Sequence, residues 1–408
     1  MTMRILAIGD TANTFGILKK YLIKSQITIF RTPHRQRDDI FLQSQDQEFF
    51  KSNNILERIK KINSIKNDFD LCIVNSWGGA IIAYLCDLNY VMYFLGNDIR
   101  SPPFVKNPQV PRPTISKRNL NFLERKFYKN VLENAIVCVA YGDELYDYLR
   151  KYRKDAFRAD RFGVDKTIFN KEVKPLDRKK QKFTFFSPQR IDLEKGTDII
   201  WEAIPLCKTD FEVIQVEWYS RYLEDNPTKL TNLIKKKPPQ VTLIPLITNT
   251  EINSYYAFAD AVIGQVGIGS FGSVEREAVF SKKAVICYSD PTFRLEVNGK
   301  KIPYPFLPKS NDPTSVARIL DEVVESKEFR EKLASDEYEI ITELFNPDKW
   351  GNECDDFFIK LKGRFKTISK NSSKLKVKFR LLFFVVGKSF HFNLMKKYYG
   401  DFRTNANP

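Results

Sequence analysis

The sequence predicts an α/β protein with two Rossmann-like, doubly wound domains that face each other across a cleft. Strand-length apolar runs alternate with helix-length amphipathic segments, which is the pattern of parallel sheets covered by helices. At 408 residues, 43% of them hydrophobic, the chain is too long for one ordinary core. The hydrophobic periodicity stops at residues 161–181, where the proportion of charged residues rises, and it restarts after them. We therefore expect a domain boundary in that segment.

Both halves of the chain show the same succession of elements. In the first half, the expected strands are Arg4–Gly9, Phe69–Val74, Tyr90–Leu95 and Ala135–Tyr141, and the expected helices are Phe15–Lys24, Gly78–Asp87 and Asn121–Glu133. In the second half, the expected strands are Phe183–Ser187, Phe211–Trp218, Val241–Pro245, Ala261–Gly264 and Ala284–Tyr288, and the expected helices are Thr197–Ile204, Asn249–Phe258 and Phe271–Phe280. Doubly wound sheets bind ligands at the carboxyl ends of their strands, so we expect a site where the two sheets face each other.

The positive charge of the chain lies mostly near its C-terminus. The formal net charge is +16, and residues 360–408 supply +12 of it, with thirteen Lys or Arg against one acidic residue. A body that carries only the remaining +4 disfavours a nucleic-acid-binding surface spread over the fold. We therefore expect a basic appendage and no nucleic acid partner.

Cysteine usage and the first residues indicate a cytoplasmic location. The six cysteines are scattered, and no pair has the spacing of metal ligands. The opening MTMRILAIGD predicts a short strand and a turn rather than a signal peptide. We expect reduced core cysteines and no bound metal.

The strongest signal for a binding site is a glycine-rich turn between a strand and a helix. Gly267, Gly269 and Gly272 satisfy the pattern G-x-G-x-x-G. Backbone N–H groups at a helix start attract phosphate oxygens, although the same glycines also suit a tight turn without a ligand. No acidic residue ends the next strand, which disfavours NAD-type binding. The binding candidates are Gly267, Ile268, Gly269, Ser270, Phe271, Gly272 and Ser273.

A basic pair follows the first strand of the second half. Arg190 and Lys195 are five residues apart, with Gly196 directly behind them. Two cations held behind a strand can stabilise negative charge that develops on a leaving group such as a phosphate. The alternative is a pair of exposed loop cations. We take Arg190 and Lys195 as the catalytic candidates.

Together these segments resemble the donor-binding region of the retaining GT-B glycosyltransferases of family 4, or glycosyl transferases group 1. The similarity includes the helix segment Gly272–Ala278, with Lys283-Ala-Val-Ile after it. The resemblance implies that Glu277 accepts hydrogen bonds from the nucleotide ribose, whereas Glu275 is expected to be a solvated helix residue. The earlier glutamate of the family pattern falls on Gly269, so one side chain that positions the sugar is missing.

Two further segments resemble the family in the right chain order. Gly163-Val-Asp165 is similar to its crossing between domains, and Gly96-Asn-Asp98-Ile-Arg100 to its loop in the first domain. Two family histidines are replaced by Asn75 and Leu95. The alternative for Asp98 and Arg100 is that they pair with each other in a turn. The acceptor-side candidates are Asn75, Asp98, Arg100 and Asp10.

The resemblance implies an organisation and an activity. Residues 1–165 form the acceptor-side domain, 166–345 the nucleotide-sugar-binding domain, and 346–365 cross back onto the first. The expected reaction transfers a sugar with retention from a UDP- or GDP-linked donor to a glycan or lipid-linked acceptor, without a metal or other cofactor. The alternative is a weak or inactive relative that only binds sugar nucleotides.

Residues 366–408 are expected to form a basic amphipathic tail. The longest apolar run there, Leu381–Val386, is six residues long, whereas a membrane span needs about 20. Apolar and basic residues together favour contact with an anionic membrane surface, on the inner face of the cell membrane. The alternative is packing on the first domain. At helical spacing one face carries Leu375, Phe379, Leu382, Val386 and Phe390.

Overall fold

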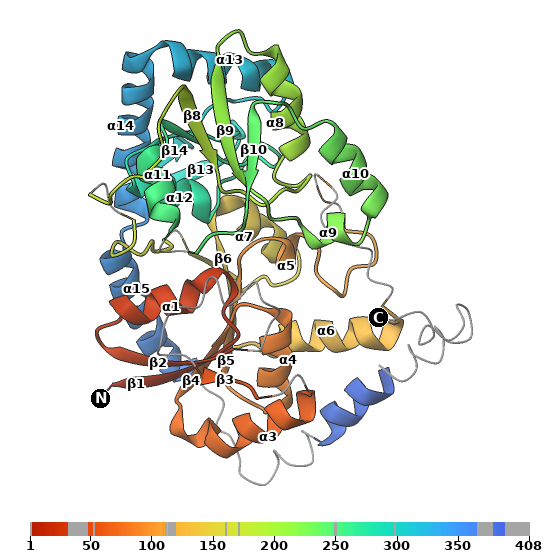
Figure 1. The fold of residues 1–408 in the computed structure, drawn as a ribbon. Coiled ribbons are helices and arrows are strands. Elements are labelled where there is room, and N and C mark those ends of the chain that lie inside the picture. Colours follow the sequence, from red (N-terminus) through yellow and green to blue (C-terminus); the bar gives the residue numbers. More distant parts are fainter. Residues whose placement is uncertain are drawn as a thin grey trace.

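The computed structural model contains two α/β domains, each built on a parallel sheet (Figure 1). It describes residues 2–31, 48–51, 54–108, 110, 112, 120–159, 161–169, 172–248, 251–297, 299–364 and 378–387.

The first domain has a seven-stranded sheet whose neighbouring strands all run parallel, in the order β3-β2-β1-β4-β5-β6-β7. All four expected strands are confirmed. Three further strands were not expected: β3 and β7, which are short and bury few apolar side chains, and β2, which buries Ile27, Ile29 and Phe30. The strands are β1 Met3–Ile8, β2 Ser25–Arg31, β3 Glu48–Phe49, β4 Leu71–Val74, β5 Tyr90–Phe94, β6 Val137–Tyr141 and β7 Phe157–Ala159.

Local sequence signals explain where the helices of the first domain begin. Asn121 and Glu124 form a reciprocal capping box at the start of α6, and the Ser76 hydroxyl accepts the N–H of Gly79 at the start of α4. The α-helices of this domain are α1 Thr14–Tyr21, α3 Ile55–Ile65, α4 Trp77–Leu85, α5 Asn97–Arg100, α6 Phe122–Asn134 and α7 Gly142–Arg150.

The second domain has a five-stranded parallel sheet in the order β10-β9-β8-β11-β12, and an antiparallel hairpin beside it. Along the chain, the strands after β8 are added on one side of it as far as β10, and β11 is then added on the other side. The loops after β8 and β11 therefore lie side by side at this topological switch point. The strands are β8 Phe183–Ser187, β9 Phe211–Val216, β10 Val241–Ile244, β11 Ala261–Ile263, β12 Ala284–Ile286, β13 Arg294–Val297 and β14 Lys300–Pro303.

One expected helix boundary in this domain is wrong. The helix predicted from Phe271 begins at Ser273, because Gly272 is extended (φ −123°, ψ −154°) and serves as the N-cap. For the helix predicted from Asn249, the first two residues lie outside the described residues. The α-helices are α8 Thr197–Ala203, α9 Arg221–Glu224, α10 Pro227–Lys235, α11 Ile252–Phe258, α12 Ser273–Phe280, α13 Pro313–Glu325 and α14 Lys327–Leu344.

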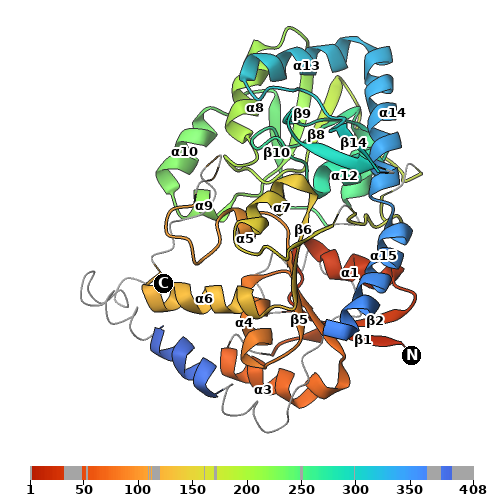
Figure 2. The ribbon, with the colours of Figure 1, turned by 180° about the vertical axis from the view of Figure 1, so that it is seen from behind.

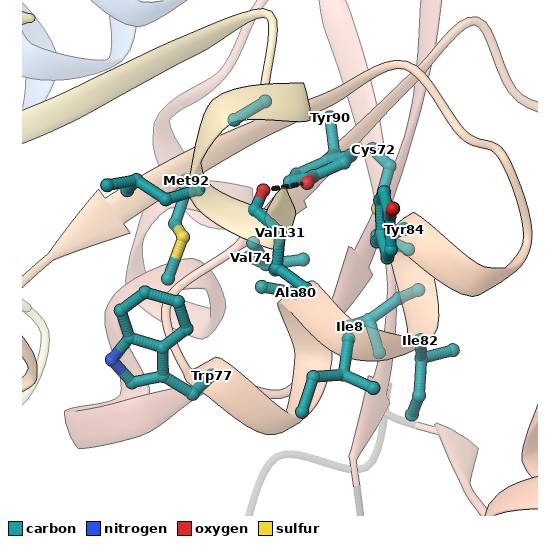
Figure 3. Close-up of a cluster of buried hydrophobic side chains, with 14 of the residues drawn as sticks. Ile8, Cys72, Val74, Trp77, Ala80, Ile82, Tyr84, Tyr90, Met92 and Val131 are labelled. Carbon is teal, nitrogen blue, oxygen red and sulfur yellow. Dashed lines mark hydrogen bonds between the residues drawn. The ribbon is translucent and has the colours of Figure 1, made fainter. Parts of the chain in front are cut away.

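Each sheet buries an apolar core on both of its faces. Figure 3 shows part of the core between the first sheet and α4, where the Tyr90 hydroxyl donates a hydrogen bond to the carbonyl of Val131. Burying that hydroxyl without a partner would be costly, so the hydrogen bond makes a tyrosine acceptable inside the core. All six cysteines are free thiols, and Cys72 and Cys138 lie in this core as expected.

The last long helix, α15 (Pro347–Leu361), lies against the first domain (Figure 2). Its Trp350 and Phe358 join the core that covers β1 and α1. The buried Asp355 carboxylate accepts hydrogen bonds from the N–H groups of Ile23 (2.8 Å) and Lys24 (2.7 Å). Two N–H groups just after α1 thereby find their acceptor on α15, more than 300 residues further along the chain.

A further helix, residues 378–387, packs beside α4 and α6 of the first domain. The buried Arg380 donates hydrogen bonds to the Tyr84 carbonyl (2.6 Å) and to the Asp87 carboxylate (2.8 Å). Within the described residues, no helix is both long enough and apolar enough to span a bilayer.

Asp355→Ala is expected to lower the free energy of unfolding by about 1–3 kcal/mol, because it removes the buried carboxylate that accepts the partly buried N–H groups of Ile23 and Lys24. Asp356→Ala is the matched control, because Asp356 is exposed and pairs with Lys24 at the surface; about 0–1 kcal/mol is expected there. Urea unfolding measures both. Equal losses in the two variants would contradict the anchoring role of Asp355.

Candidate active site

The glycine-rich turn after β11 is held in place by the buried carboxylate of Glu275. This carboxylate accepts hydrogen bonds from the N–H groups of Gln265 (2.7 Å) and Gly272 (2.6 Å), and from the side-chain amide of Gln189 (2.6 Å). The expectation that Glu275 is solvated is wrong, since its exposure is 0%. Its position three residues after the N-cap is that of a capping-box glutamate, a signal present in the sequence.

Two of the glycines allow the loops after β8 and β11 to touch backbone to backbone. A Cβ on Gly267 would lie 2.0 Å from the carbonyl oxygen of Glu194, and one on Gly196 would lie 2.8 Å from the Gly267 nitrogen. Gly196 also has a φ of +79°, which disfavours any other residue. The turn therefore places its N–H groups close to Lys195.

Gly269, which stands where the family pattern has a glutamate, has no room for a side chain. Its φ is +73°, and a Cβ there would lie 2.6 Å from the Cβ of Asp290. The backbone conformation of the turn therefore excludes a glutamate at position 269.

The two catalytic candidates differ in their surroundings. The Lys195 ammonium donates to the Gln265 side chain (2.6 Å), and burial lowers its pKa. Arg190 is 31% exposed and pairs with Asp192 at 2.7 Å and Glu194 at 3.6 Å. Lys195 lines the cavity between the domains, whereas Arg190 does not.

That cavity has a volume of about 240 Å³. It is lined by five of the seven residues predicted from the glycine-rich turn, together with Lys195 and Arg100. Gly267, Gly269 and Glu277 are not among its lining residues. The lining comprises Ala12, Leu95, Arg100, Tyr141, Gly142, Glu144, Leu145, Phe162, Lys195, Gln265, Ile268, Ser270, Phe271, Gly272, Ser273, Arg276, Arg294, Leu295, Glu296, Tyr304, Leu344 and Phe345.

Glu277, the ribose candidate, lies on the neighbouring face of α12. Its carboxylate is 3.5 Å from the Tyr256 hydroxyl on α11. Burial and the nearby Glu275 raise the pKa of Glu277 from its ordinary 4.5 to about 8, against the opposing charge of Arg276. The carboxyl group is therefore largely neutral near pH 7.

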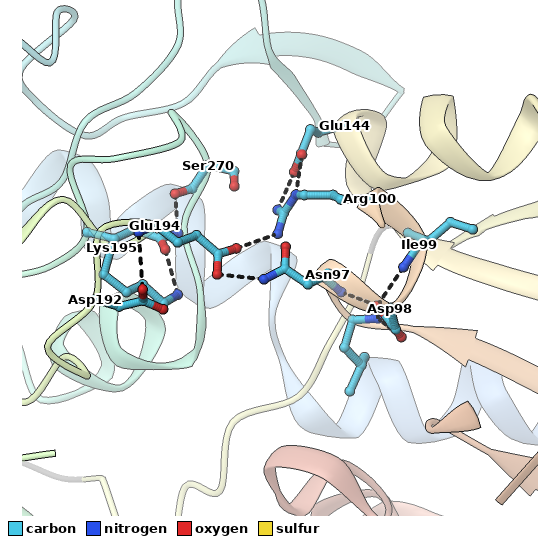
Figure 4. Close-up of polar contacts among 12 residues, drawn as sticks. Asn97, Asp98, Ile99, Arg100, Glu144, Asp192, Glu194, Lys195 and Ser270 are labelled. Atoms are coloured by element: carbon cyan, nitrogen blue, oxygen red, sulfur yellow. Dashed lines mark hydrogen bonds and ion pairs between the residues drawn. The ribbon is translucent and has the colours of Figure 1, made fainter. Parts of the chain in front are cut away.

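A cluster of charged and polar side chains connects the two domains. Glu194 of the second domain accepts hydrogen bonds from Asn97 (2.6 Å) and Arg100 (3.2 Å) of the first. Figure 4 shows Arg100 between this carboxylate and that of Glu144, which it contacts with two nitrogens at 2.6 Å each. The alternative in which Arg100 pairs with Asp98 is wrong.

The other acceptor-side candidates organise the backbone rather than line the cavity. The buried Asp98 carboxylate accepts the N–H groups of Leu95, Gly96 and Ile99, and burial raises its pKa to about 6. It therefore caps its own turn at the end of β5.

Asp10 and Asn75 shape the loop after β1. Asp10 accepts the N–H groups of Phe15 and Gly16, each at 2.9 Å, and pairs with Arg31 at 2.8 Å. The Asn75 side-chain oxygen accepts the N–H of Thr11 at 2.9 Å. Only Ala12 of this loop lines the cavity.

Comparison with solved structures identifies this arrangement. Over 88% of the chain and 100% of the compared chain, it is similar to HepE of Anabaena in complex with UDP and glucose (TM-score 0.66, 18% identity). It is also similar to sucrose-phosphate synthase of Thermosynechococcus elongatus over 89% and 100% of the two chains (TM-score 0.65, 15% identity). The fold is GT-B.

Two more findings accompany this GT-B fold. Residues 168–339, which lie within the second domain, match the family model for glycosyl transferases group 1. A glycosyltransferase of Rickettsia africae is similar over 88% of this chain and 99% of its own (TM-score 0.57, 16% identity). No curated protein sequence matches the chain closely.

Three site residues were not anticipated from the sequence: Glu144, Glu194 and Arg276. Glu194 is next to Lys195 in the sequence and Arg276 is next to Glu277, but their contacts with Arg100 and Phe162 of the first domain appear only in the folded chain. Within the described ranges, no group of three or more His, Cys, Asp or Glu residues is arranged to hold a metal ion.

The raised pKa of Glu277 makes a testable contribution to stability. Because its folded pKa lies above its unfolded value, folding takes up a proton between about pH 5 and about pH 8, and stability falls as pH rises through this window. Relative to Glu277→Gln, the wild type should lose up to about 1.4 kcal/mol per pH unit there. Urea unfolding across pH measures this, with the exposed Glu331→Gln as a control. If the free energy of unfolding changed with pH in the same way in the wild type and in Glu277→Gln, the raised pKa of Glu277 would be contradicted.

Proposed function

We propose that this GT-B protein transfers a sugar from a UDP- or GDP-linked donor, with retention, to a glycan or lipid-linked acceptor. The observation that carries the proposal is the Lys195 ammonium, which lines the interdomain cavity beside the N-terminus of α12. The similarity to HepE bound to UDP and glucose supports a nucleotide-sugar donor.

In this proposal the diphosphate lies between Lys195 and the turn that ends at Gly272. The Lys195 charge and the N–H groups at the start of α12 stabilise the negative charge that develops on the leaving nucleotide. Both are preorganised, because Glu275 holds the turn and Gln265 holds the ammonium. Arg190 has to exchange its contact with Asp192 for the phosphate, and Glu277 binds the ribose.

The second candidate is a relative that binds nucleotide-sugars without turnover. Gly269 favours it, because the turn has no space for the carboxylate that the family pattern places there. The two candidates agree on donor binding and differ only in sugar transfer.

Lys195→Ala is expected to weaken UDP or GDP binding roughly 10- to 100-fold, the effect of losing one charge-assisted contact to a phosphate. Isothermal titration of the free nucleotides measures this, and release of sugar from the nucleotide-sugar measures turnover. Arg318→Ala, an exposed arginine on α13, is the control that should retain wild-type affinity.

Nucleotide binding with sugar release, both weakened in Lys195→Ala, would support the transferase. Binding without release, even with lipid extracts offered as acceptors, would favour the inactive relative. Failure of every nucleotide to bind would refute the donor site.

We also propose that the C-terminal segment contacts an anionic membrane surface. In helix 378–387, Phe379 (72% exposed), Leu382 (59%) and Val386 (46%) share one face. Their predicted companions, Leu375 and Phe390, lie outside the described residues. Arg380 fixes the opposite face of this helix to the first domain, so both packing and membrane contact are compatible. The net charge of residues 360–408 supplies the attraction to anionic lipid.

The double variant Phe379→Ser/Leu382→Ser is expected to weaken vesicle binding by at least about tenfold, because it removes apolar area from the interface. Sedimentation of the full chain with phosphatidylglycerol and phosphatidylcholine vesicles measures this. Leu56→Ser on α3, 52% exposed, is the control. Equal binding to both lipids, or no effect of the double variant, would refute membrane contact through this face.

A further inference from the structure

Arg276, on α12, is a buried arginine that lines the GT-B cavity and makes no salt bridge in the described structure, although the charges of Glu277 and Glu275 act on it from the same helix. Its exposure is 9%. One guanidinium nitrogen donates to the Ser273 hydroxyl at 3.2 Å, and its buried Nε has no hydrogen-bond partner in the described structure. A guanidinium has five N–H donors and no acceptor, so most of its capacity is directed at whatever enters the cavity.

The other buried arginines of the described chain are all paired with carboxylates. Arg31 contacts Asp10. Arg100 contacts Glu144 and Glu194, Arg153 contacts Asp155, and Arg380 contacts Asp87. Burying an unpaired charge is unfavourable, and this protein avoids it elsewhere. Arg276 is the exception, because no carboxylate lies within salt-bridge distance of it in the described structure and its Nε has no hydrogen-bond partner there.

Two aromatic rings hold the Arg276 guanidinium in place. It lies 4.3 Å from the centroid of Phe162 and 5.1 Å from that of Phe345. Ring faces attract a cation but accept no strong hydrogen bond, so they orient the group without satisfying it. Burial lowers the pKa of Arg276 to about 10, which still leaves it charged near neutral pH.

A second cation faces the same space. Arg294, on β13, lines the cavity and donates to the backbone carbonyls of Pro291 and Phe293. The two acidic residues of the lining are already engaged, Glu144 by Arg100 and Glu296 by Arg158. Among the lining residues, the charges that make no salt bridge are therefore positive, and the nearby Glu277 compensates little because burial raises its pKa to about 8.

We propose that this cavity binds an oxyanion, a carboxylate or a phosphate, carried on the sugar portion of a substrate, with Arg276 as its main partner and Arg294 as the second. The inference rests on the proposed function, in which Lys195 and the glycine-rich turn take the diphosphate. Arg276 is then left for an additional anion. The volume of about 240 Å³ lies below the range of drug-sized ligand pockets and suits one sugar ring.

Isothermal titration with the full chain tests this in two arms. The first compares UDP-glucuronate with UDP-glucose, and the second, at saturating UDP, compares glucuronate and glucose 6-phosphate with glucose. We expect an acidic probe to bind at least about tenfold more tightly than its neutral counterpart in one arm. The first arm identifies an anion on the donor sugar and the second one on the acceptor.

The variants Arg276→Met and Arg294→Gln should each reduce this preference, which is a ratio of two affinities measured in the same variant, so that any change in UDP affinity cancels. Arg318→Met, at the surface of α13, is the matched control. Because Arg276→Met removes an unpaired buried charge, its thermal midpoint should equal or exceed that of the wild type. If Arg276→Met does not fold, the loss of preference for the acidic probe in Arg294→Gln still tests the proposal.

Equal affinity for acidic and neutral probes in both arms would overturn the inference, as would a preference that survives in both variants. If UDP itself does not bind, the proposed donor site fails. The free acidic sugars, titrated without UDP, still test Arg276 in that case.

Discussion

The carboxylate of Glu275 is the contact on which the candidate site depends. It is fully buried, and it gathers the N–H of Gly272, the N–H of Gln265 and the side chain of Gln189 around one group. These partners come from the loops after β8 and β11, which meet at the switch point of the second sheet. A solvated loop could not keep its N–H groups aimed at one point, whereas this one is held by charge-assisted hydrogen bonds in a dry environment.

The cavity itself depends on how the two domains close. Glu194 connects the second domain to Asn97 and Arg100 of the first, directly beside Lys195. The chain crosses between domains near Phe162 and Phe345, and both rings lie against Arg276. Domain contacts therefore determine the charge as well as the shape of the site, because they decide which cations are paired and which face the ligand.

Four buried ionisable groups on and beside this cavity have shifted pKa values. Burial raises the pKa of Glu277 to about 8 and that of Asp98 to about 6, and it lowers the pKa values of Lys195 and Arg276. Each of these groups is less stable buried than it would be in water, unless a partner compensates. Asp98 is compensated by its own turn, whereas Arg276 is not. Such uncompensated groups are typical of binding sites rather than of structural cores.

The sequence by itself determined the α/β class, most of the strands, and the chain order of the basic pair and the glycine-rich turn. These features depend on short-range periodicity and on glycine and capping chemistry, which a linear pattern records. The burial of Glu275 was also readable from its capping-box position, although it was expected to be solvated. Only the tertiary structure decided that Arg100 pairs with Glu144 and Glu194 rather than with Asp98, that Arg190 faces Asp192, and that Arg276 lines the cavity unpaired. These outcomes depend on contacts between residues far apart in the chain, and burial, which sets their energies, exists only once both domains have folded and met.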